Sequence, residues 1–497
     1  MIKPLLVCLL AASASAAVFD VKTYGAKGDG QSQDRDSINK AIEAASAAGG
    51  GTVEFGPGTY ISGSIRLRSN ITLRLEPGTV IEASSDAKEY DAAEPNASDK
   101  FQDFGHSHWH NSLIWGENVS NIAIVGAGLI SGKALVRERG GGGDKAIALK
   151  LCHNVTLRDF SILNGGHFGI LTTGVDNLTI DNLKIDTNRD GMDIDSTSNV
   201  RITNTSVNAP NDDAIVFKGS HALGYARVSE NVMISDCLVS GFEVGSLLDA
   251  TYKRTVEKSP DRDGPTGRIK IGTESEGDFR NFAISNVTFD RSRGLALESV
   301  DGSHIEDIAV SNITMRDVSN GPFFIRIGSR MRAPEGVAIG TIKRVNISNV
   351  VVYNADPRFA SMIAGIPGHE VEDVKFSNIR IVAKGGFSLD EAAKQPAEMV
   401  NTFFSRQIGG MPARTDPMAV PEQEKGYPEP SIFGILPAWG FFIRHAKGIE
   451  LDGIDLSTIQ PDKRPAFVLI DTQDFVLRNS KPVADMKLDS VTGVKSF

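Results

Sequence analysis

The chain has 497 residues, of which 40% are hydrophobic and 23% charged, a composition that suits a globular protein with a sizeable core. Its formal net charge of −10 at pH 7 argues against nucleic acid as a partner. Three cysteines are too few for a disulfide framework, and we expect Cys152 and Cys237 to be two buried thiols.

The first sixteen residues are typical of a secretory signal peptide. Lys3 supplies the positive start, residues 5–10 the apolar run, and residues 14–16 the small-residue cleavage site. The apolar run is too short to span a bilayer. We therefore predict a secreted or periplasmic protein with no membrane partner, whose mature chain begins near Ala17.

Residues 17–84 are predicted to form an N-terminal cap and the first coils of the fold. One helix face has the spacing i, i+3, i+4, i+7 and consists of Ile38, Ala41, Ile42 and Ala45. Asp34 or Asp36 is the expected N-cap, and Gly49–Gly51 ends the helix. Such a helix would cover the open edge of the first coil and protect it from aggregation.

A short unit of strand, bend and strand then recurs along the chain. Copies with alternating apolar and polar residues begin at Asn154, Asn177, Asn199 and Asn231. Later copies begin at Asn281, Asp307, Arg344 and Asp373, and an outlying copy begins at Gly448. The tightest spacings, 22 and 23 residues, are too short for a unit with a crossover helix and predict a parallel β-helix.

Interruptions of the repeat define the predicted organisation. The main coil spans residues 85–384, an inserted loop or lid spans 385–440, and C-terminal coils and tail span 441–497. The asparagines at the bends are interpreted as stacking within the coil. Longer spacings predict loops that wall a cleft, including the charged segment Thr251–Gly267. The aromatic stretch Tyr427–Trp439 suits either a sugar-facing loop or hydrophobic packing.

Three acidic residues lie on two consecutive copies of the unit. Asp190 is 22 residues before Asp212, which is followed by Asp213. Because parallel strands stack roughly 4.8 Å apart, these carboxylates should crowd together, and their pKa values should separate. An acid beside a base is what hydrolysis of a glycosidic bond requires. Asp193 and Asp195 alternate onto one face and are interpreted as structural, and no metal is predicted because no His or Cys completes the cluster.

Several motifs resemble glycoside hydrolase family 28, the pectin-degrading polygalacturonases and rhamnogalacturonan hydrolases. They are FDVKTYGAKGDG from Phe19, GGGTVEFGPGTY from Gly49, and NSLIWGENVSNIAIVGAGLISG from Asn111. The family's N-T-D-G-hydrophobic-D motif appears as NRDGMD at 188–193, and its D-D motif at 212–213.

The resemblance implies an all-β, right-handed parallel β-helix that hydrolyses pectic polysaccharide or oligosaccharide with inversion. It assigns Asp212 as the general acid, and Asp190 and Asp213 as the residues that activate water. A monomer without a cofactor is expected.

The chain departs from the family at two further motifs. The family's Gly-His-Gly is replaced by Pro-Thr-Gly, with Thr266 at its centre, and Ala296 and Glu298 stand where the family has its Arg-x-Lys pair. Arg268 and Lys270, one turn earlier, could supply a displaced pair for a substrate carboxylate. Alternatively they form a solvent-facing pair, or salt bridges to Glu274 and Glu298.

Substrate contacts are predicted from the motifs and their surroundings. The predicted substrate-binding residues are Asn188, His167, Arg268, Lys270 and Glu298, and the cluster His106, His108, Trp109 and His110 is a further candidate. Glu298 is expected to repel a substrate carboxylate, so we predict weak cleavage of polygalacturonate and better activity on rhamnose-bearing pectic chains, attacked from an end. The alternatives are a β-helix polysaccharide lyase, with Lys270 or Arg268 as base, and a carbohydrate-binding β-helix without catalysis.

Overall fold

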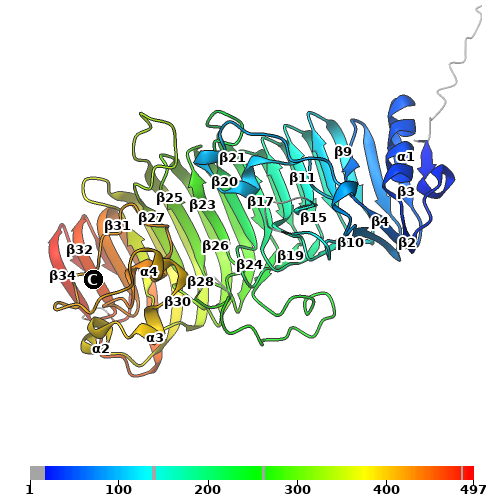
Figure 1. Cartoon of the computed structure of the whole chain (residues 1–497). Coiled ribbons are helices and arrows are strands. Elements are labelled where there is room, and N and C mark those ends of the chain that lie inside the picture. Colours follow the sequence, from blue (N-terminus) through cyan, green and yellow to red (C-terminus); the bar gives the residue numbers. More distant parts are fainter. Residues whose placement is uncertain (1–16, 137–141, 260–262, 483–484, 497) are drawn as a thin grey trace, which may run out of the picture.

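The computed structural model describes residues 17–136, 142–259, 263–482 and 485–496, so the predicted signal peptide lies outside the described residues. The strands wind into one elongated coil, and the strands of successive turns pair in parallel (Figure 1). The predicted parallel β-helix is confirmed. Within the described ranges, no helix combines the length and apolar character needed to cross a membrane.

Each turn in the middle of the coil contributes one strand to each of three sheets. The first, here called the site sheet, contains β5 (Ile65–Arg66), β8 (Ile114–Glu117), β11 (Lys145–Lys150), β14 (Phe168–Thr173), β17 (Asp190–Asp195), β20 (Ile215–Gly219), β23 (Ile269–Ser275), β25 (Leu295–Ser299), β27 (Phe323–Ile327) and β29 (Ser361–Ala364). The second contains β1 (Val18–Asp20), β3 (Gly51–Phe55), β6 (Ile71–Leu75), β9 (Ser120–Val125), β12 (His153–Arg158), β15 (Asp176–Asp181), β18 (Ser198–Thr203) and β21 (Ser229–Ser235). The third contains β2 (Asp29–Gln33), β4 (Gly58–Ser62), β7 (Thr79–Ala83), β10 (Leu129–Ser131), β13 (Ser161–Leu163), β16 (Lys184–Asp186), β19 (Ser206–Asn208) and β22 (Leu238–Ser240).

The second and third sheets merge in the C-terminal half. Long strands there run through both sheets: β24 (Phe279–Asp290), β26 (His304–Arg316), β28 (Thr341–Ala355) and β30 (Val371–Gly385). Strand β31 (Phe441–Gln460) pairs with β29 of the site sheet through residues 441–444 and with β30 through its later residues. The last coil is formed by β32 (Phe467–Gln473), β33 (Val476–Arg478), β34 (Met486–Thr492) and β35 (Lys495–Ser496). One continuous core of inward-facing apolar residues runs from Val21 to Leu477.

Helix α1 (Arg35–Ala47) lies at the N-terminal end of the coil, as predicted (Figure 1). The face predicted from its spacing is fully buried: Ile38, Ala41, Ile42 and Ala45. Asp34 occupies the N-cap position, but its carboxylate accepts from the backbone N–H groups of Lys27 and Gly28 instead of capping the helix. This carboxylate therefore ties the preceding loop to the start of the helix.

The bend asparagines form a ladder along the outside of the coil. Asn154, Asn177 and Asn231 all have a positive φ, between 55° and 58°. Asn177 Nδ2 donates to Asn154 Oδ1 at 2.9 Å, and Asn154 Nδ2 donates to Asn121 Oδ1 at the same distance. The ladder supports the structural interpretation of these residues, because each side chain stabilises a bend conformation that few residue types adopt.

The segment between β30 and β31, residues 386–440, leaves the coil and is called the insertion. It contains α2 (Leu389–Lys394), α3 (Ala397–Val400), α4 (Phe403–Gln407) and a short 3-10 helix, η5 (Pro430–Phe433). Its apolar residues, among them Phe404 and Phe433, pack on outward-facing residues of β27, β29 and β31. In Figure 1 its helices lie beside the C-terminal half of the coil.

Candidate active site

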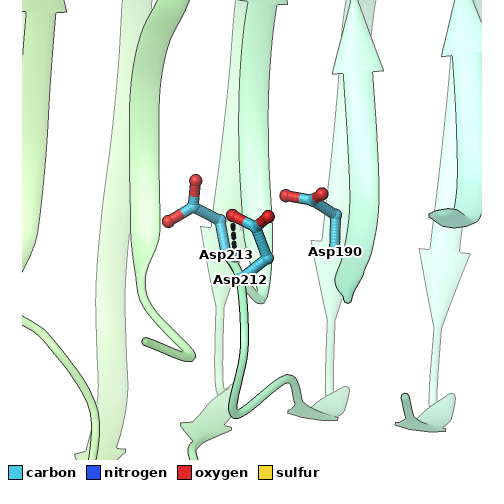
Figure 2. A group of neighbouring side chains, drawn as sticks. All are labelled: Asp190, Asp212 and Asp213. Carbon is cyan, nitrogen blue, oxygen red and sulfur yellow. Dashed lines mark hydrogen bonds between the residues drawn. The ribbon is translucent and has the colours of Figure 1, made fainter. Parts of the chain in front are cut away.

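Strands β17 and β20 place three aspartates side by side. Asp190 begins β17, whereas Asp212 and Asp213 lie in the turn that precedes β20. The two strands are adjacent in the site sheet, and Gly191 N donates to Asp213 O at 2.9 Å. One carboxylate oxygen from each aspartate lies within 4.8 Å of the others. Figure 2 shows the three side chains gathered on one side of the coil.

The aspartates line a cavity of about 290 Å³. Its lining residues are Asp103, His106, His167, Phe168, Arg189, Asp190, Asp193, Asp212, Asp213, Lys218, Lys270, Arg332, Phe403, Phe404, Gln407 and Tyr427. They come from the site sheet, from the segment before β8, and from the insertion. The described residues of the predicted cleft loop 251–267 do not line this cavity. The insertion supplies its aromatic wall instead.

Asp213 is a buried carboxylate held by two cations. Arg268 Nε donates to its Oδ1 at 2.7 Å, and Lys270 Nζ forms an ion pair with its Oδ2. Burial acts to raise the pKa of Asp213, but Lys270 and Arg268 outweigh burial and lower the pKa to about 2. Asp213 is therefore charged across the physiological range.

Asp190 has the opposite character although it lies next to Asp213. Burial, followed by the negative charge of Asp212, raises the pKa of Asp190 to about 8. Arg189 Nη2 lies 2.8 Å from Asp212 Oδ2 and 3.7 Å from Asp190 Oδ2, so its charge falls mainly on Asp212. The raised pKa favours the protonated form of Asp190 at neutral pH, whereas the donor predicted from the sequence is Asp212.

A second charged layer lies further along the same strands. His106 Nε2 lies 3.2 Å from Asp193 Oδ2, and Lys218 Nζ lies 2.8 Å from Glu274 Oε2. Burial lowers the pKa of His106 to about 3 and raises that of Asp193 well above its usual value. The contact between His106 and Asp193 therefore joins two neutral groups beneath the three aspartates.

Asp195 has the structural role that the sequence predicts. Its carboxylate accepts from the backbone N–H of Ser220 at 3.0 Å, from the Ser220 hydroxyl, and from the Ser196 hydroxyl at 3.0 Å. These contacts satisfy a buried carboxylate within the sheet.

Arg268 and Lys270 do not form the solvent-facing pair considered above. Both are buried, at 3% and 1% exposed, and both are engaged by Asp213. Lys270 reaches the cavity lining, whereas Arg268 lies behind it and also contacts Glu429. Neither offers the free positive charge that a displaced carboxylate-binding pair would need.

The expectation that Glu298 faces a substrate carboxylate is wrong. Glu298 is fully buried, does not line the cavity, and lies 3.9 Å from Arg268. Burial raises its pKa to about 7. Its strand, β25, pairs in register with β23 so that Ala296 lies next to Lys270, and Glu298 accepts from the Thr273 hydroxyl of β23 at 3.3 Å.

The remaining candidates for substrate contact divide between the cavity and its surroundings. His167 lines the cavity beside Phe168, with the two ring centroids 4.4 Å apart. Asn188 does not line it; this residue is exposed, and its Oδ1 accepts from Asn211 Nδ2.

In the aromatic and histidine cluster, only His106 lines the cavity. His108 contacts Asp144 at 2.6 Å, and His110 contacts Glu117 at 2.8 Å. Trp109 is fully buried and donates Nε1–H to the Thr173 hydroxyl at 3.0 Å. A sugar-stacking role for Trp109 is therefore excluded, because its ring packs within the protein.

Several cavity residues were missed by sequence reasoning. Arg189 occupies the threonine position of the family's N-T-D-G motif, and Lys218 follows the aspartate pair on β20, so position alone could have indicated both. Tyr427 belongs to the aromatic stretch for which a sugar-facing loop was one of two interpretations, whereas Arg332 and Phe404 gave no comparable signal. The rings of Phe404 and Tyr427 stack at 4.2 Å with an interplanar angle of 10°, and tertiary packing brings them to the aspartates.

The three carboxylates could also be considered as ligands for a divalent cation, since their oxygens are close enough together. However, Arg189 contacts Asp212, and Arg268 and Lys270 contact Asp213. These protein cations compensate the negative charge that would attract a metal. The arrangement fits proton transfer better than metal binding.

Comparisons with known proteins point to the same β-helix fold that the structure shows. The family model described as rhamnogalacturonase A/epimerase, pectate lyase-like matches residues 18–166, and the model of the right-handed β-helix region matches residues 111–259. A probable polygalacturonase of Vitis vinifera is 23% identical over 392 residues, which cover 74% of this chain and 74% of that protein.

Two solved structures share the fold. An exopolygalacturonase from Thermotoga maritima has a TM-score of 0.60 at 21% identity, with 74% of this chain and 87% of that chain covered. The family 28 exopolygalacturonase of Yersinia enterocolitica has a TM-score of 0.65 at 16% identity, with 97% and 79% covered. The chain therefore shares the right-handed parallel β-helix of these structures, and it is similar in sequence to polygalacturonases over most of its length.

Proposed function

We propose that this protein is a secreted hydrolase that cleaves glycosidic bonds in pectin-type polysaccharides or their oligosaccharides. The observation that carries the proposal is the separation of pKa values within one cavity, with Asp190 raised to about 8 and Asp213 lowered to about 2. A protonated carboxyl beside a carboxylate that is charged at neutral pH is the acid and base that glycoside hydrolysis needs. The similarity to polygalacturonases supports the class of substrate.

In the proposed reaction, the transferable proton passes to the glycosidic oxygen while water attacks the anomeric carbon. The carbon–oxygen bond to the leaving group breaks, and Asp213 accepts the proton that the water loses. Asp212 is the donor predicted from the sequence, and Asp190, whose pKa is raised to about 8, is the rival donor. One oxygen of each carboxyl lies within 4.8 Å of the other, a separation that one bridging water spans.

We propose inversion of the anomeric configuration. The close approach of the oxygens, within 4.8 Å, is shorter than the roughly 6.5–9.5 Å between carboxyls of typical inverting enzymes and by itself favours retention. The ion pairs of Asp213 oppose retention, because Arg268 and Lys270 each hold one oxygen of this carboxylate and keep it from moving to bond the anomeric carbon. Proton NMR of the first-formed anomer distinguishes the two outcomes.

A lyase reaction is the second candidate, and the contacts of its two possible bases argue against it. Burial lowers the pKa of Lys270, but the charge of Asp213 outweighs it, so the pKa is raised overall. The pKa of Arg268 is raised well above its usual value by Glu429 and Asp213 despite its burial. Neither side chain can give up a proton readily and act as the base of an elimination.

We further propose attack from a chain end, supported by the insertion. Its residues Phe403, Phe404, Gln407 and Tyr427 stand along one side of a cavity whose volume suits one or two sugar rings. A long polysaccharide passing through the site would have to displace this wall.

Product analysis in H₂¹⁸O tests the proposal. We expect pectic oligosaccharides to yield saturated products that carry one ¹⁸O at the new reducing end. Unsaturated products that absorb in the near ultraviolet and lack ¹⁸O would establish a lyase. Binding without any product from a panel of pectic fractions would establish a carbohydrate-binding protein.

A further inference from the structure

A buried series of ion pairs connects Asp213 with the insertion. Arg268 donates Nε–H to Asp213 Oδ1 at 2.7 Å, and donates Nη2–H to Glu429 Oε2 at 3.0 Å. The three residues are 3%, 1% and 0% exposed, respectively. One guanidinium therefore contacts a carboxylate of the cavity and a carboxylate of the insertion.

Glu429 is fixed from the side of the coil as well. Its Oε1 accepts from Asn320 Nδ2 at 3.0 Å and forms an ion pair with Arg293 Nη1. Arg293 lies just before β25 and Asn320 shortly before β27, so two turns of the coil hold this one side chain. Glu429 is also the residue that precedes η5 in the insertion.

These contacts have energetic consequences for Arg268. A buried guanidinium that loses one of its carboxylate partners keeps less compensation for its charge. The planar fork binds partners in fixed directions, so a carboxylate at each edge sets its orientation. Without Glu429, only Asp213 and the more distant Glu298, 3.9 Å away, would orient Arg268.

We propose that Glu429 is a positioning residue for the reaction, which holds the carboxylate of Asp213 in its working orientation through Arg268. The proposal rests on the hydrolase function proposed above. It makes the insertion a functional part of the active site, because residues 427 and 429 supply the cavity wall and the support of the base from the same short segment.

Kinetics of Glu429→Gln test the proposal. The amide keeps the size of the side chain and one acceptor but loses the charge that orients Arg268. We expect kcat to fall roughly 10- to 100-fold, the range expected for misplacing a reacting group by a fraction of an ångström to about 1 Å. KM should change less than about threefold, because Glu429 does not line the cavity.

A double-mutant cycle separates positioning from a general structural effect. If Glu429 acts through Arg268, then Glu429→Gln should have little further effect on kcat in an Arg268→Gln background. Independent, multiplying effects of the two substitutions would overturn the proposal. Asn320→Ala, which leaves all charges in place and removes one hydrogen bond to Glu429, should lower kcat in the same sense by a smaller factor.

Asp462→Asn is the matched control. Asp462 has a side chain that is 0% exposed and is paired with Arg464 at 2.8 Å, and its Oδ2 accepts from Phe387 N at the start of the insertion. We expect it to lower the melting temperature without lowering kcat of the folded enzyme. Equal losses of kcat in Glu429→Gln and Asp462→Asn, or an unchanged kcat in Glu429→Gln and Asn320→Ala, would contradict the positioning role. A wild-type protein that hydrolyses no pectic substrate would instead contradict the proposed function itself.

Discussion

Asp190, Asp212 and Asp213 are identical side chains with different neighbours, which shift the pKa values of Asp190 and Asp213 in opposite directions. Asp213 has two cations, Asp212 has Arg189, and Asp190 has burial and the charge of Asp212. Three adjacent carboxylates cannot all ionise at neutral pH, so the proton stays where cationic compensation is weakest. At this scale the surroundings, and not the residue types, decide which group is acid and which is base.

The identity of the general acid is the first prediction. We expect Asp212→Asn to lower the hydrolysis rate on a natural glycoside by roughly 10²–10⁴-fold, because the amide has no transferable proton. A substrate with a nitrophenol leaving group needs no protonation, so it should restore most of the rate in the general-acid variant. Steady-state rates on both substrates provide the measurement.

The matched variant is Asp190→Asn. If the activated substrate restores this variant and leaves Asp212→Asn inactive, then Asp190 donates the proton and the assignment of Asp212 is wrong. Full activity of Asp212→Asn on the natural glycoside would remove it from the mechanism.

The second prediction concerns stability and pH. The folded pKa of Asp190, about 8, is above its ordinary value of 3.8. The contribution of Asp190 to the free energy of unfolding is therefore fully present below about pH 4 and is lost as the pH rises toward 8. We expect Asp190→Asn to raise the melting temperature at pH 8 by roughly 2 °C or more relative to wild type, with a smaller difference at pH 4.5.

Asp181→Asn gives the opposite case. Hydrogen bonds from Asn204 and Thr203 lower the pKa of Asp181, so its contribution is present at neutral pH and is lost on acidification. This variant should be no more stable than wild type at pH 8. A difference in melting temperature between Asp190→Asn and wild type that is the same at every pH would contradict the raised pKa.

At the scale of elements, the coil depends on its bends as much as on its strands. Successive turns stay in register because each inward-facing apolar residue stacks on the residue one turn below. The bend asparagines also keep the turns aligned. This regularity brings Asp190 beside Asp213 even though the motifs are 22 residues apart in the chain.

The third prediction tests the ladder. Asn177 has φ of 58° and donates to Asn154, but it lies far from the cavity lining. Asn177→Ala should lower the free energy of unfolding by about 2 kcal/mol, through the lost hydrogen bond and the left-handed conformation. Asn177→Gly should lower the free energy of unfolding by only about 1 kcal/mol, because glycine adopts this conformation readily. Denaturant unfolding measures both, and equal losses would show that φ makes no contribution.

At the scale of the whole molecule, the cavity is built by segments that are far apart in sequence. The site sheet supplies the carboxylates and their cations, whereas the insertion supplies Phe404 and Tyr427. The insertion therefore adds two stacked aromatic rings to the lining of the same cavity as the carboxylates.

Substrate preference is the fourth prediction. Arg268 and Lys270 are occupied by Asp213, so they cannot also bind a uronate carboxylate as a displaced Arg-x-Lys pair. We expect initial rates on rhamnogalacturonan oligosaccharides to exceed those on polygalacturonate, with one small product released from the chain end. Rates and product sizes by chromatography, measured side by side, provide the test.

Two results would contradict this prediction. A tenfold preference for polygalacturonate would mean that another cation binds the carboxylate. A rapid fall in the viscosity of a polymer solution before small products accumulate would show internal cleavage.

The sequence by itself determined the coil, its capping helix and the position of the aspartates. Apolar residues that alternate along strands and recur every 22 or 23 residues are all buried when successive strands stack in parallel. The local pattern therefore predicts the overall fold. The helix face of α1 follows from spacing alone for the same reason.

Tertiary structure alone decided what surrounds the aspartates. The sequence indicated that Arg268 and Lys270 could act as a pair, but not that both would contact Asp213, nor that Glu298 would be fully buried outside the cavity lining. Glu429 and Tyr427 reach the site from more than 200 residues away, by a segment that follows no repeat. Charge in a buried site depends on three-dimensional neighbours, because burial and ion pairs act over a few ångströms in space regardless of separation along the chain.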